Sequence, residues 1–355
     1  MNCKGQLCED KHKPSFVMNI HELETTARSL VAAGKGILAA DESSPTIEKR
    51  FKSINVPSTE ETRRAYREML FATPRLGEAI SGVILFDETL RQKAADGTPL
   101  AEVLRRQGIM PGIKVDKGAK ALAGFPGEKV TEGLDGLRER LAEYVRLGAK
   151  FTKWRAVITI GDQIPSRFCL EANAHALARF AALSQEAGLV PIVEPEVLMD
   201  GTHTIERHFE VTEAAQQLVF RALSHHHLHL EGMLLKPNMV LAGKDCPQPA
   251  SVAQVAEMTL RCLRRTVPAA VPGIVFLSGG QSDVLATEHL NAMNRLGKAP
   301  WELSFSFGRA LQAPALKAWA GKRENVATAQ KALQHRAQCN NAARFGKYSA
   351  VMETI

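Results

Sequence analysis

The chain has 355 residues, of which 45% are hydrophobic and 23% charged, which indicates a globular protein with a sizeable core and excludes a disordered chain. Its 45 Lys and Arg outnumber its 38 Asp and Glu, and the resulting net charge of +7 suits anionic small substrates or loose adhesion to polyanions. No block of like charges and no nucleic-acid-binding motif accompanies this surplus, so we expect no nucleic acid partner.

The spacing of the cysteines and the length of the apolar runs indicate the cellular compartment in which the protein is expected. The six cysteines, at positions 3, 8, 169, 246, 262 and 339, have no C-x-x-C spacing. Scattered cysteines of this kind favour reduced thiols and argue against a disulfide framework or a zinc site. Neither a signal-peptide pattern at the N-terminus nor a run of about eighteen apolar residues is found. We therefore expect a cytoplasmic protein that does not enter a membrane.

Short apolar runs recur along the chain, and each is followed by a polar residue, a loop and an amphipathic stretch. The runs predict strands over 37–40, 80–86, 110–115, 151–158, 190–193, 233–235, 273–277 and 303–307. Helical spacing predicts helices over 21–33, from 47 onward, and over 60–72, 133–147, 172–186, 211–225, 251–265 and 282–294. This alternation is typical of an α/β fold of the (β/α)8 TIM barrel type, and no G-x-G-x-x-G follows the first strand to favour a dinucleotide-binding sheet.

A single domain is expected, because no linker-like segment divides residues 20–320. Residues 1–20 are interpreted as an N-terminal arm. A helix is predicted from Lys322, and residues 345–355 are interpreted as a C-terminal tail of a kind that is usually mobile.

Polar side chains follow every predicted strand, at the barrel end where such folds keep their chemistry. In strand order they are Asp41, Asp87, Lys114 with Asp116, Lys153 with Arg155, Glu194 with Glu196, Lys236, Ser278, and Arg309. A single charged strand end is usually only solvated, but a whole ring of them indicates an active site. Arg155 is counted among the candidates for binding substrate.

Lys236 is the most informative of these residues. An apolar run precedes it and Pro237, which cannot extend a strand ladder, follows it, so its amine is expected at the end of a buried strand. Burial and the charges of Lys114 and Lys153 would keep part of the amine neutral, and a neutral amine attacks carbonyl groups to form a Schiff base. The alternative is a lysine whose charge simply reaches solvent.

Two carboxylates and two groups of anion-binding residues complete the predicted site. Glu194 and Asp41, if unlike surroundings separate their pKa values, can act as acid and base. A phosphate grip is predicted at the last two strands, formed by Ser278, Gly279, Gly280, Ser306, Gly308 and Arg309. A second anion is expected across the mouth, held by Ser43, Thr46, Arg50 and Lys114. The substrate would then carry two anionic groups.

The histidine-rich run Ser224–His229 resembles a metal site. It precedes the sixth predicted strand, however, so it is expected at the opposite end of the barrel from Lys236, in a structural or interface role, and no metal site is predicted.

Seven segments resemble motifs of the class I, metal-independent fructose-bisphosphate aldolases and occur in the same order. They are Gly36–Ser43, Gly112–Gly118, Lys153–Arg155, Val193–Glu196, Leu234–Met239, Leu277–Ser282 and Gly308–Ala310. The resemblance covers roughly residues 15–348. It implies reversible aldol cleavage of fructose 1,6-bisphosphate to dihydroxyacetone phosphate and glyceraldehyde 3-phosphate, in glycolysis and gluconeogenesis, by a homotetramer without metal or other cofactor.

The resemblance also implies roles for individual residues. Lys236 matches the Schiff-base lysine, Glu194 the acid/base that dehydrates the carbinolamine, and Asp41 the group that takes the C4 hydroxyl proton. Lys153 matches a positive group beside the imine. Positions matching phosphate-binding residues are Arg50, Ser278, Gly279, Gly280, Ser306 and Arg309, with Lys114, Ser43 and Thr46 near the other phosphate.

The C-terminal end departs from the family pattern. Eukaryotic members end on a tyrosine that assists proton exchange at the enamine carbon, whereas this chain ends on Ile355 and its three tyrosines lie at 66, 144 and 348. The enamine proton transfer and the preference for the bisphosphate over fructose 1-phosphate are therefore open. The alternatives are a transaldolase-like or monophosphate aldolase and a non-catalytic protein that binds polyanions through its basic surface.

Overall fold

The computed structural model describes residues 19–354. The strands that form the barrel are β1 (Gly36–Ala40), β2 (Ile80–Leu85), β3 (Met110–Lys114), β6 (Phe151–Ile158), β7 (Val190–Val197), β8 (Leu234–Leu235), β9 (Gly273–Phe276) and β10 (Glu302–Phe307). They close in the order β1-β10-β9-β8-β7-β6-β3-β2, and every neighbouring pair is parallel. The predicted (β/α)8 barrel is confirmed.

Most strand ends differ from the prediction by no more than one residue, but β7 differs by four, and β7 and the short strand β8 matter for the site. Strand β7 continues to Val197 instead of ending at Val193, because it pairs with β6 over eight residues, from Phe151↔Val190 to Ile158↔Val197. The acidic side chains of Glu194 and Glu196 therefore lie within a strand and not beyond it. Strand β8 has only two residues, since the proline at 237 cannot donate to a ladder.

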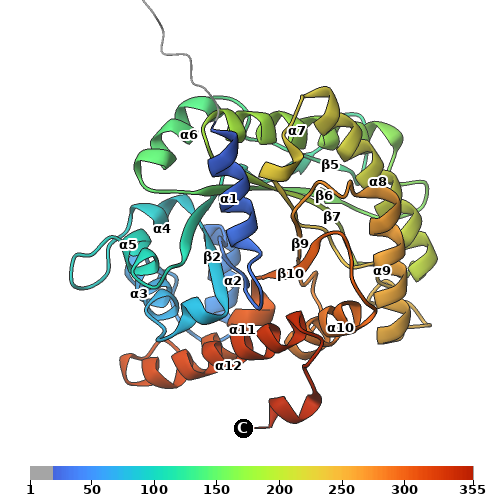
Figure 1. The fold of residues 1–355 in the computed structure, drawn as a ribbon. Coiled ribbons are helices and arrows are strands. Elements are labelled where there is room, and N and C mark those ends of the chain that lie inside the picture. The colour runs from blue at the N-terminus through green and yellow to red at the C-terminus, as the bar shows by residue number, and fades with distance from the viewer. Residues whose placement is uncertain (1–18, 355) are drawn as a thin grey trace, which may run out of the picture.

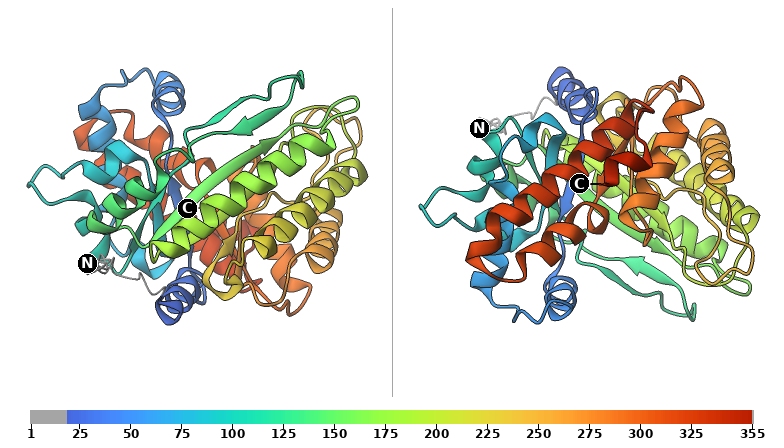
Figure 2. Two further views of the ribbon diagram at one scale, coloured as in Figure 1. Left: turned by 90° about the horizontal axis from the view of Figure 1, so that it is seen from above. Right: turned by 90° about the horizontal axis from the view of Figure 1, so that it is seen from below.

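Helices surround the barrel and alternate with its strands (Figures 1 and 2). They are α1 (Ile20–Leu30), α2 (Ser44–Lys52), α3 (Glu60–Phe71), α4 (Asp87–Arg91), α5 (Leu100–Arg105), α6 (Leu137–Arg146), α7 (Arg167–Glu186), α8 (Ile205–His225), α9 (Val252–Thr266), α10 (Asp283–Arg295), α11 (Arg309–Trp319) and α12 (Val326–Arg344). Between residues 19 and 354, no helix is both long and apolar enough to span a bilayer.

Some helices and one hairpin were not predicted. Helices α7 and α8 begin earlier than their apolar periodicity indicates, because Ser166 and Thr204 cap them by accepting hydrogen bonds from the backbone N–H groups of Cys169 and Arg207. Helices α4, α5 and α11 escaped prediction. The short antiparallel strands β4 (Ala119–Ala121) and β5 (Lys129–Thr131) form a hairpin between β3 and α6 that projects from the barrel in Figure 2.

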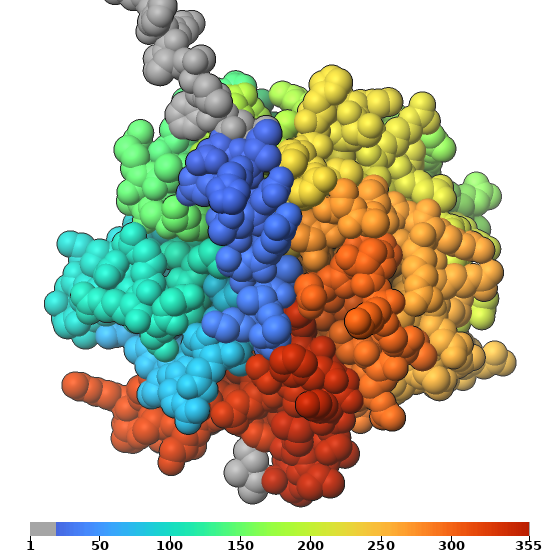
Figure 3. Space-filling view, viewed as in Figure 1, coloured from blue at the N-terminus to red at the C-terminus, as the bar shows by residue number. Residues whose placement is uncertain are grey.

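Helix α1 covers the amino ends of the strands, and Figure 3 shows it between the surrounding helices. Its buried residues Leu23, Ala27 and Leu30 share one apolar cluster with barrel side chains such as Phe151. The Phe151 ring occupies the space beside Gly112, where an added Cβ would lie 2.2 Å from the ring. This end of the barrel is thus filled with apolar side chains, and the polar chemistry is left to the other end.

The histidine-rich run lies at this filled end, as expected. It begins in the last residues of α8 and precedes β8, and His229 Nε2 lies 2.9 Å from Glu24 Oε1 of α1. The ring of His226 packs against that of His175 at a centroid distance of 5.3 Å. These contacts fit a structural role.

The C-terminal segment packs back onto the last helix, whereas most of the N-terminal arm is not described. Residues 1–18, which include most of the expected N-terminal arm, lie outside the described residues. After α12 the chain turns at Phe345 and forms a 3-10 turn, η4 (Ala350–Glu353), that returns to α12 through side-chain contacts of Glu353. The mobility expected of residues 345–355 stays a prediction.

Replacing Phe151 by alanine should lower the free energy of unfolding by about 3–5 kcal/mol, since a fully buried ring is removed and a cavity remains. The matched control is Phe168→Ala, because residue Phe168 is 51% exposed. This substitution should lower the free energy of unfolding by less than about 1.5 kcal/mol. Urea unfolding curves of both variants measure the difference. Equal losses would contradict this account of the filled barrel end.

Candidate active site

Four charged side chains from four strands meet inside the carboxyl end of the barrel. Lys153 Nζ lies 3.0 Å from Asp41 Oδ2 and 2.8 Å from Glu194 Oε2. Lys236 Nζ lies 3.3 Å from Glu194 Oε1. The four form a row of alternating charge, Asp41, Lys153, Glu194, Lys236, and none of these side chains is more than 11% exposed.

The backbone around Lys236 is held on both sides. Its N–H donates to the carbonyl of Val193 in β7 at 2.8 Å, and the carbonyl of Pro237 accepts from Leu277 at 3.1 Å. The side chain of Asn238 accepts from the backbone N–H of Val197 at 2.9 Å. The short strand β8 is therefore tied to β7 and β9 beyond its own ladder, which fixes the direction in which the lysine enters the barrel.

Burial is the largest influence on the Lys236 amine, and it lowers the pKa of that amine because the charged form is desolvated. The carboxylates of Glu194 and Asp41 oppose this shift, while the charge of Lys153 reinforces it, and the net pKa is below the ordinary lysine value. Of the two lysines expected to act on this amine, Lys153 does so. The Lys114 ammonium instead contacts Asp116, whose carbonyl oxygen is 2.9 Å away.

Asp41 and Glu194 are affected in the same direction. Burial would raise the pKa of each carboxyl, but nearby lysines outweigh burial and leave both pKa values lowered. Lys153 is the strongest of these charges for both groups. The two carboxylates share the Lys153 ammonium group, and the expected separation of their pKa values stays a prediction.

The other charged residues of the strand ends form a second layer. Arg155 is ion-paired with Glu196 through its Nε atom, and its backbone N–H donates to Asp116 Oδ2 at 3.2 Å. Arg155 thus lies beside the row of charges with a side chain that is 40% exposed. Asp87 lies outside this group: it begins α4 and pairs with Arg91 on the surface.

The residues of the predicted phosphate grip lie where β9 and β10 end. Gly279 and Gly280 have positive φ angles of 58° and 92°, which side-chain-bearing residues rarely adopt. An added Cβ at Gly280 would lie 3.3 Å from Arg309 Nη2, so the Arg309 guanidinium lies against the glycine loop. Ser278 and Ser306 are buried at 7% and 1% exposure, and Ser306 Oγ has no hydrogen-bond partner. A buried hydroxyl without a partner suits a ligand oxygen.

Arg50 approaches the same strand ends from α2. An added Cβ at Gly308 would lie 3.8 Å from Arg50 Nη2, so this guanidinium borders the turn that precedes Arg309. Ser43 and Thr46 lie at the first turn of α2, with their hydroxyl oxygens 3.1 Å apart. The residues predicted to bind the two anions therefore lie at the carboxyl ends of the strands.

Sequence reasoning missed a buried network that holds Arg50. The Glu42 carboxylate pairs with Arg50 on one oxygen and with Arg67 of α3 on the other. Gln312 of α11 donates to Glu42 Oε1 at 2.9 Å and accepts from the Tyr66 hydroxyl at 3.1 Å. Glu42 directly follows Asp41, which was predicted to end a strand. This position next to a predicted site residue was the feature of the sequence that could have indicated Glu42.

A closed barrel with charged side chains gathered at the carboxyl ends of its strands defines a barrel enzyme. The sequence model described as "Fructose-bisphosphate aldolase class-I" matches residues 22–354. The chain belongs to the class I fructose-bisphosphate aldolase family and is a lyase.

Individual relatives agree with this assignment. The chain is 59% identical over 332 residues to a probable fructose-bisphosphate aldolase class 1 of Xanthomonas axonopodis pv. citri, covering 93% of this chain and 99% of the relative. It is 55% identical to fructose-bisphosphate aldolase of Dictyostelium discoideum over 94% of both chains. A solved structure of Plasmodium falciparum aldolase, in complex with TRAP and a small molecule inhibitor, superposes with a TM-score of 0.92 at 50% identity, covering 96% of this chain and 98% of that one.

Changing Glu42 to glutamine should lower the free energy of unfolding at neutral pH by about 3–5 kcal/mol, because Arg67 loses the partner of its buried charge. Burial would raise the pKa of Glu42, but Arg67 and Arg50 lower it, so the wild type gains stability above the ordinary carboxyl pKa and loses it as pH falls. The difference in free energy of unfolding between the wild type and Glu42→Gln should therefore become smaller at acid pH. Urea unfolding at several pH values measures it.

The control for this prediction is Glu61→Gln. Glu61 also pairs with an arginine, Arg64, but its side chain is 71% exposed, so the change should cost less than about 1 kcal/mol. If the loss in free energy of unfolding caused by Glu42→Gln is the same at neutral and acid pH, the buried carboxylate is not the cause of that loss.

Proposed function

We propose that the chain catalyses the reversible aldol cleavage of fructose 1,6-bisphosphate through a Schiff base on Lys236, in glycolysis and gluconeogenesis. The observation that carries the proposal is the Lys236 amine, 3% exposed and 3.3 Å from a carboxylate, at the end of a barrel strand. Glycines and arginines suited to phosphate groups border the same strand ends.

The first steps use Lys236 and Glu194 as a pair. A proton passes from the Lys236 ammonium to the Glu194 carboxylate, over the 3.3 Å that separates Nζ and Oε1, and leaves a neutral amine beside a carboxylic acid. The amine attacks the C2 carbonyl carbon and forms a carbinolamine. Glu194 then returns the proton to the departing hydroxyl, water leaves, and an iminium ion remains on Lys236. The lowered pKa of Lys236 makes the initial proton transfer easier.

The cleavage step uses Asp41 as the base. The iminium withdraws the electron pair of the C3–C4 bond, Asp41 accepts the C4 hydroxyl proton, and glyceraldehyde 3-phosphate leaves as the C4 aldehyde. The resulting enamine takes up a proton at C3, and hydrolysis of the imine releases dihydroxyacetone phosphate and restores the Lys236 amine. Lys153, 3.0 Å from Asp41 and 2.8 Å from Glu194, keeps both carboxylates ionised between proton transfers. Because the iminium itself accepts the electrons, the scheme needs no metal.

The two phosphates would occupy opposite sides of this row of charges. The C1 phosphate is assigned to the glycine loop with Ser278, Ser306, Arg309 and Arg50, where Ser306 Oγ has no partner of its own. The C6 phosphate is assigned to Ser43, Thr46 and Lys114. We further propose a cytoplasmic location, in keeping with the name of the related cytosolic aldolase 4 of Arabidopsis thaliana, which is 54% identical. A homotetramer is proposed from the family resemblance alone.

Treatment with dihydroxyacetone phosphate and borohydride should add the mass of the reduced adduct to the peptide that contains Lys236. Lys236→Arg should abolish this labelling and lower kcat by roughly four orders of magnitude or more, since arginine stays protonated. Lys244→Arg is the control, because Lys244 has a 53% exposed side chain paired with Asp200. Labelling of Lys153 instead, or turnover that a chelator abolishes, would contradict the scheme.

Comparing fructose 1,6-bisphosphate with fructose 1-phosphate tests the assignment of the two phosphates. Arg309→Ala should lower kcat/KM for both substrates roughly ten- to 150-fold, which corresponds to the loss of about 1.5–3 kcal/mol for a charge-assisted hydrogen bond. Ser43→Ala should lower kcat/KM for the bisphosphate and leave the monophosphate unaffected. The control is Arg323→Ala, an exposed arginine in a 3-10 turn (η3, Arg323–Asn325). If Ser43→Ala affects both substrates equally, the C6 phosphate does not bind at α2.

A further inference from the structure

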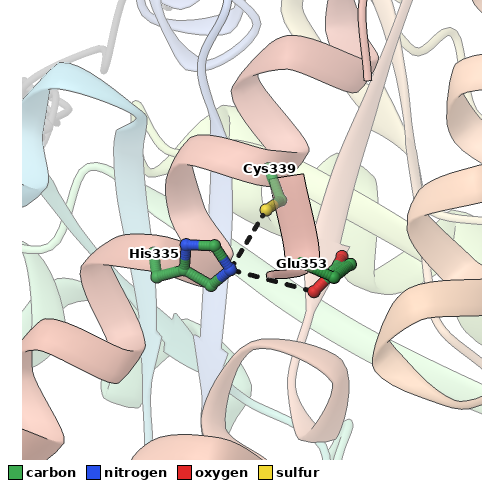
Figure 4. A group of neighbouring side chains, drawn as sticks. All are labelled: His335, Cys339 and Glu353. Carbon is green, nitrogen blue, oxygen red and sulfur yellow. Dashed lines mark hydrogen bonds and ion pairs between the residues drawn. The ribbon is translucent and has the colours of Figure 1, made fainter. Parts of the chain in front are cut away.

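A histidine, a cysteine and a glutamate converge at the C-terminal end of the chain, apart from the active-site row of charges. His335 and Cys339 lie one turn apart on the same face of α12, and Glu353 approaches them from η4 (Figure 4). His335 Nε2 lies 3.6 Å from Cys339 Sγ and 3.8 Å from Glu353 Oε2. Within residues 19–354 this is the group of three such side chains whose ligand atoms all lie within 4.8 Å of one another.

The two separations from His335 Nε2 are close to those of a tetrahedral zinc site, while the separation between Cys339 Sγ and the Glu353 carboxylate, which is within 4.8 Å, would have to reach about 3.6 Å. With Zn–S of about 2.3 Å and Zn–N and Zn–O of about 2.0–2.1 Å, tetrahedral angles place the nitrogen about 3.6 Å from the sulfur and about 3.4 Å from the oxygen. The first of these separations is already present, and the second requires a contraction of a few tenths of an ångström. His, Cys and carboxylate are also the donor types that zinc prefers.

The carboxylate is already oriented for this role by groups that are not ligands. The Tyr348 hydroxyl donates to Glu353 Oε1 at 2.7 Å, and Arg336 Nη1 contacts both carboxylate oxygens at 2.5 Å. Arg336 is itself fixed, because it is 2% exposed and donates to Thr287 Oγ1 at 2.6 Å. Metal-ligating carboxylates are commonly held by such hydrogen bonds, and here Oε2, which Arg336 also contacts, lies 3.8 Å from His335 Nε2.

The charges of the cluster allow a divalent cation. A thiolate and a carboxylate would neutralise the ion, and the positive charge of Arg336, which contacts Glu353, is also faced by Asp283, whose Oδ2 lies 3.9 Å from Arg336 Nε. Without metal, burial raises the pKa of the Cys339 thiol to about 11, so the thiol is protonated at neutral pH and metal binding releases that proton.

We propose that His335, Cys339 and Glu353 form a zinc-type site with water in the fourth position, which joins the C-terminal segment to α12. The cysteine positions alone did not indicate this site, because its third ligand comes fourteen residues after the cysteine, on a different element. The site is independent of the aldol chemistry, because none of its residues belongs to the row of charges around Lys236.

The test is a titration of the metal-free full-length chain with Co²⁺. One equivalent should produce the thiolate-to-cobalt charge-transfer absorption and the visible bands of tetrahedral cobalt, and Zn²⁺ should displace both. Cys339→Ser should abolish the charge-transfer band. His335→Ala, at a partly exposed position, should weaken cobalt affinity by about tenfold or more. Cys246→Ser, which removes a partly exposed thiol outside the cluster, should leave the titration unchanged.

Carboxypeptidase digestion measures the link to the C-terminal segment. Zn²⁺ should slow the release of residues from the C-terminus of the wild type and of Cys246→Ser, and should have no effect on Cys339→Ser. Circular dichroism of each variant checks that its fold is retained, and His335→Ala serves if Cys339→Ser does not fold. Absence of the charge-transfer band in the wild type, or its persistence in Cys339→Ser, would overturn the proposal.

Discussion

The active site depends on one ammonium group, that of Lys153, placed between two carboxylates that come from different parts of the barrel. Asp41 follows β1 and Glu194 lies in β7, and these strands are not neighbours in the sheet, so their side chains meet only across the interior. Lys153 and Glu194 lie in β6 and β7 and Lys236 follows β8, strands that are neighbours in any case, but an open sheet would separate Asp41 from Lys153. Removing one partner of a buried ion pair is strongly unfavourable. Closure of the barrel and ionisation of the site are therefore coupled, and Lys236 acquires its depressed pKa within that arrangement.

The sequence was most informative where local chemistry and strand position coincide. An apolar run closed by Pro237 predicts the place of Lys236, because a proline ends a ladder whatever its surroundings. The fold class followed from alternation alone. The pairing of Glu42 with Arg67 could not be predicted in the same way, because α3 carries several arginines and its pattern does not reveal that Arg67 is buried. Nor does the run before Glu194 reveal that β7 continues, since that depends on pairing with β6.

The C-terminal cluster illustrates a second limit of sequence reasoning. His335 and Cys339 have a helical spacing that is common in proteins without metal, and Glu353 joins them only because the chain turns after α12. The contacts that bring it back involve Arg336, Tyr348 and Thr287, which lie on three separate segments. Such a site follows from tertiary packing, and a motif search that requires adjacent ligands does not find it.

The fixed position of Arg50 bears on its proposed role in binding phosphate. Its side chain is 23% exposed and is held by Glu42, which Arg67 and Gln312 hold in turn, so the guanidinium has little rotational freedom before any phosphate arrives. A free arginine would lose about 0.5–1.5 kcal/mol of conformational entropy on binding. Arg50 loses this entropy already when the protein folds. The proposed anion site is therefore preorganised. If Arg50 binds phosphate as proposed, part of the selectivity for phosphate would come from the rigidity of Glu42, a neighbouring carboxylate that does not bind the ligand.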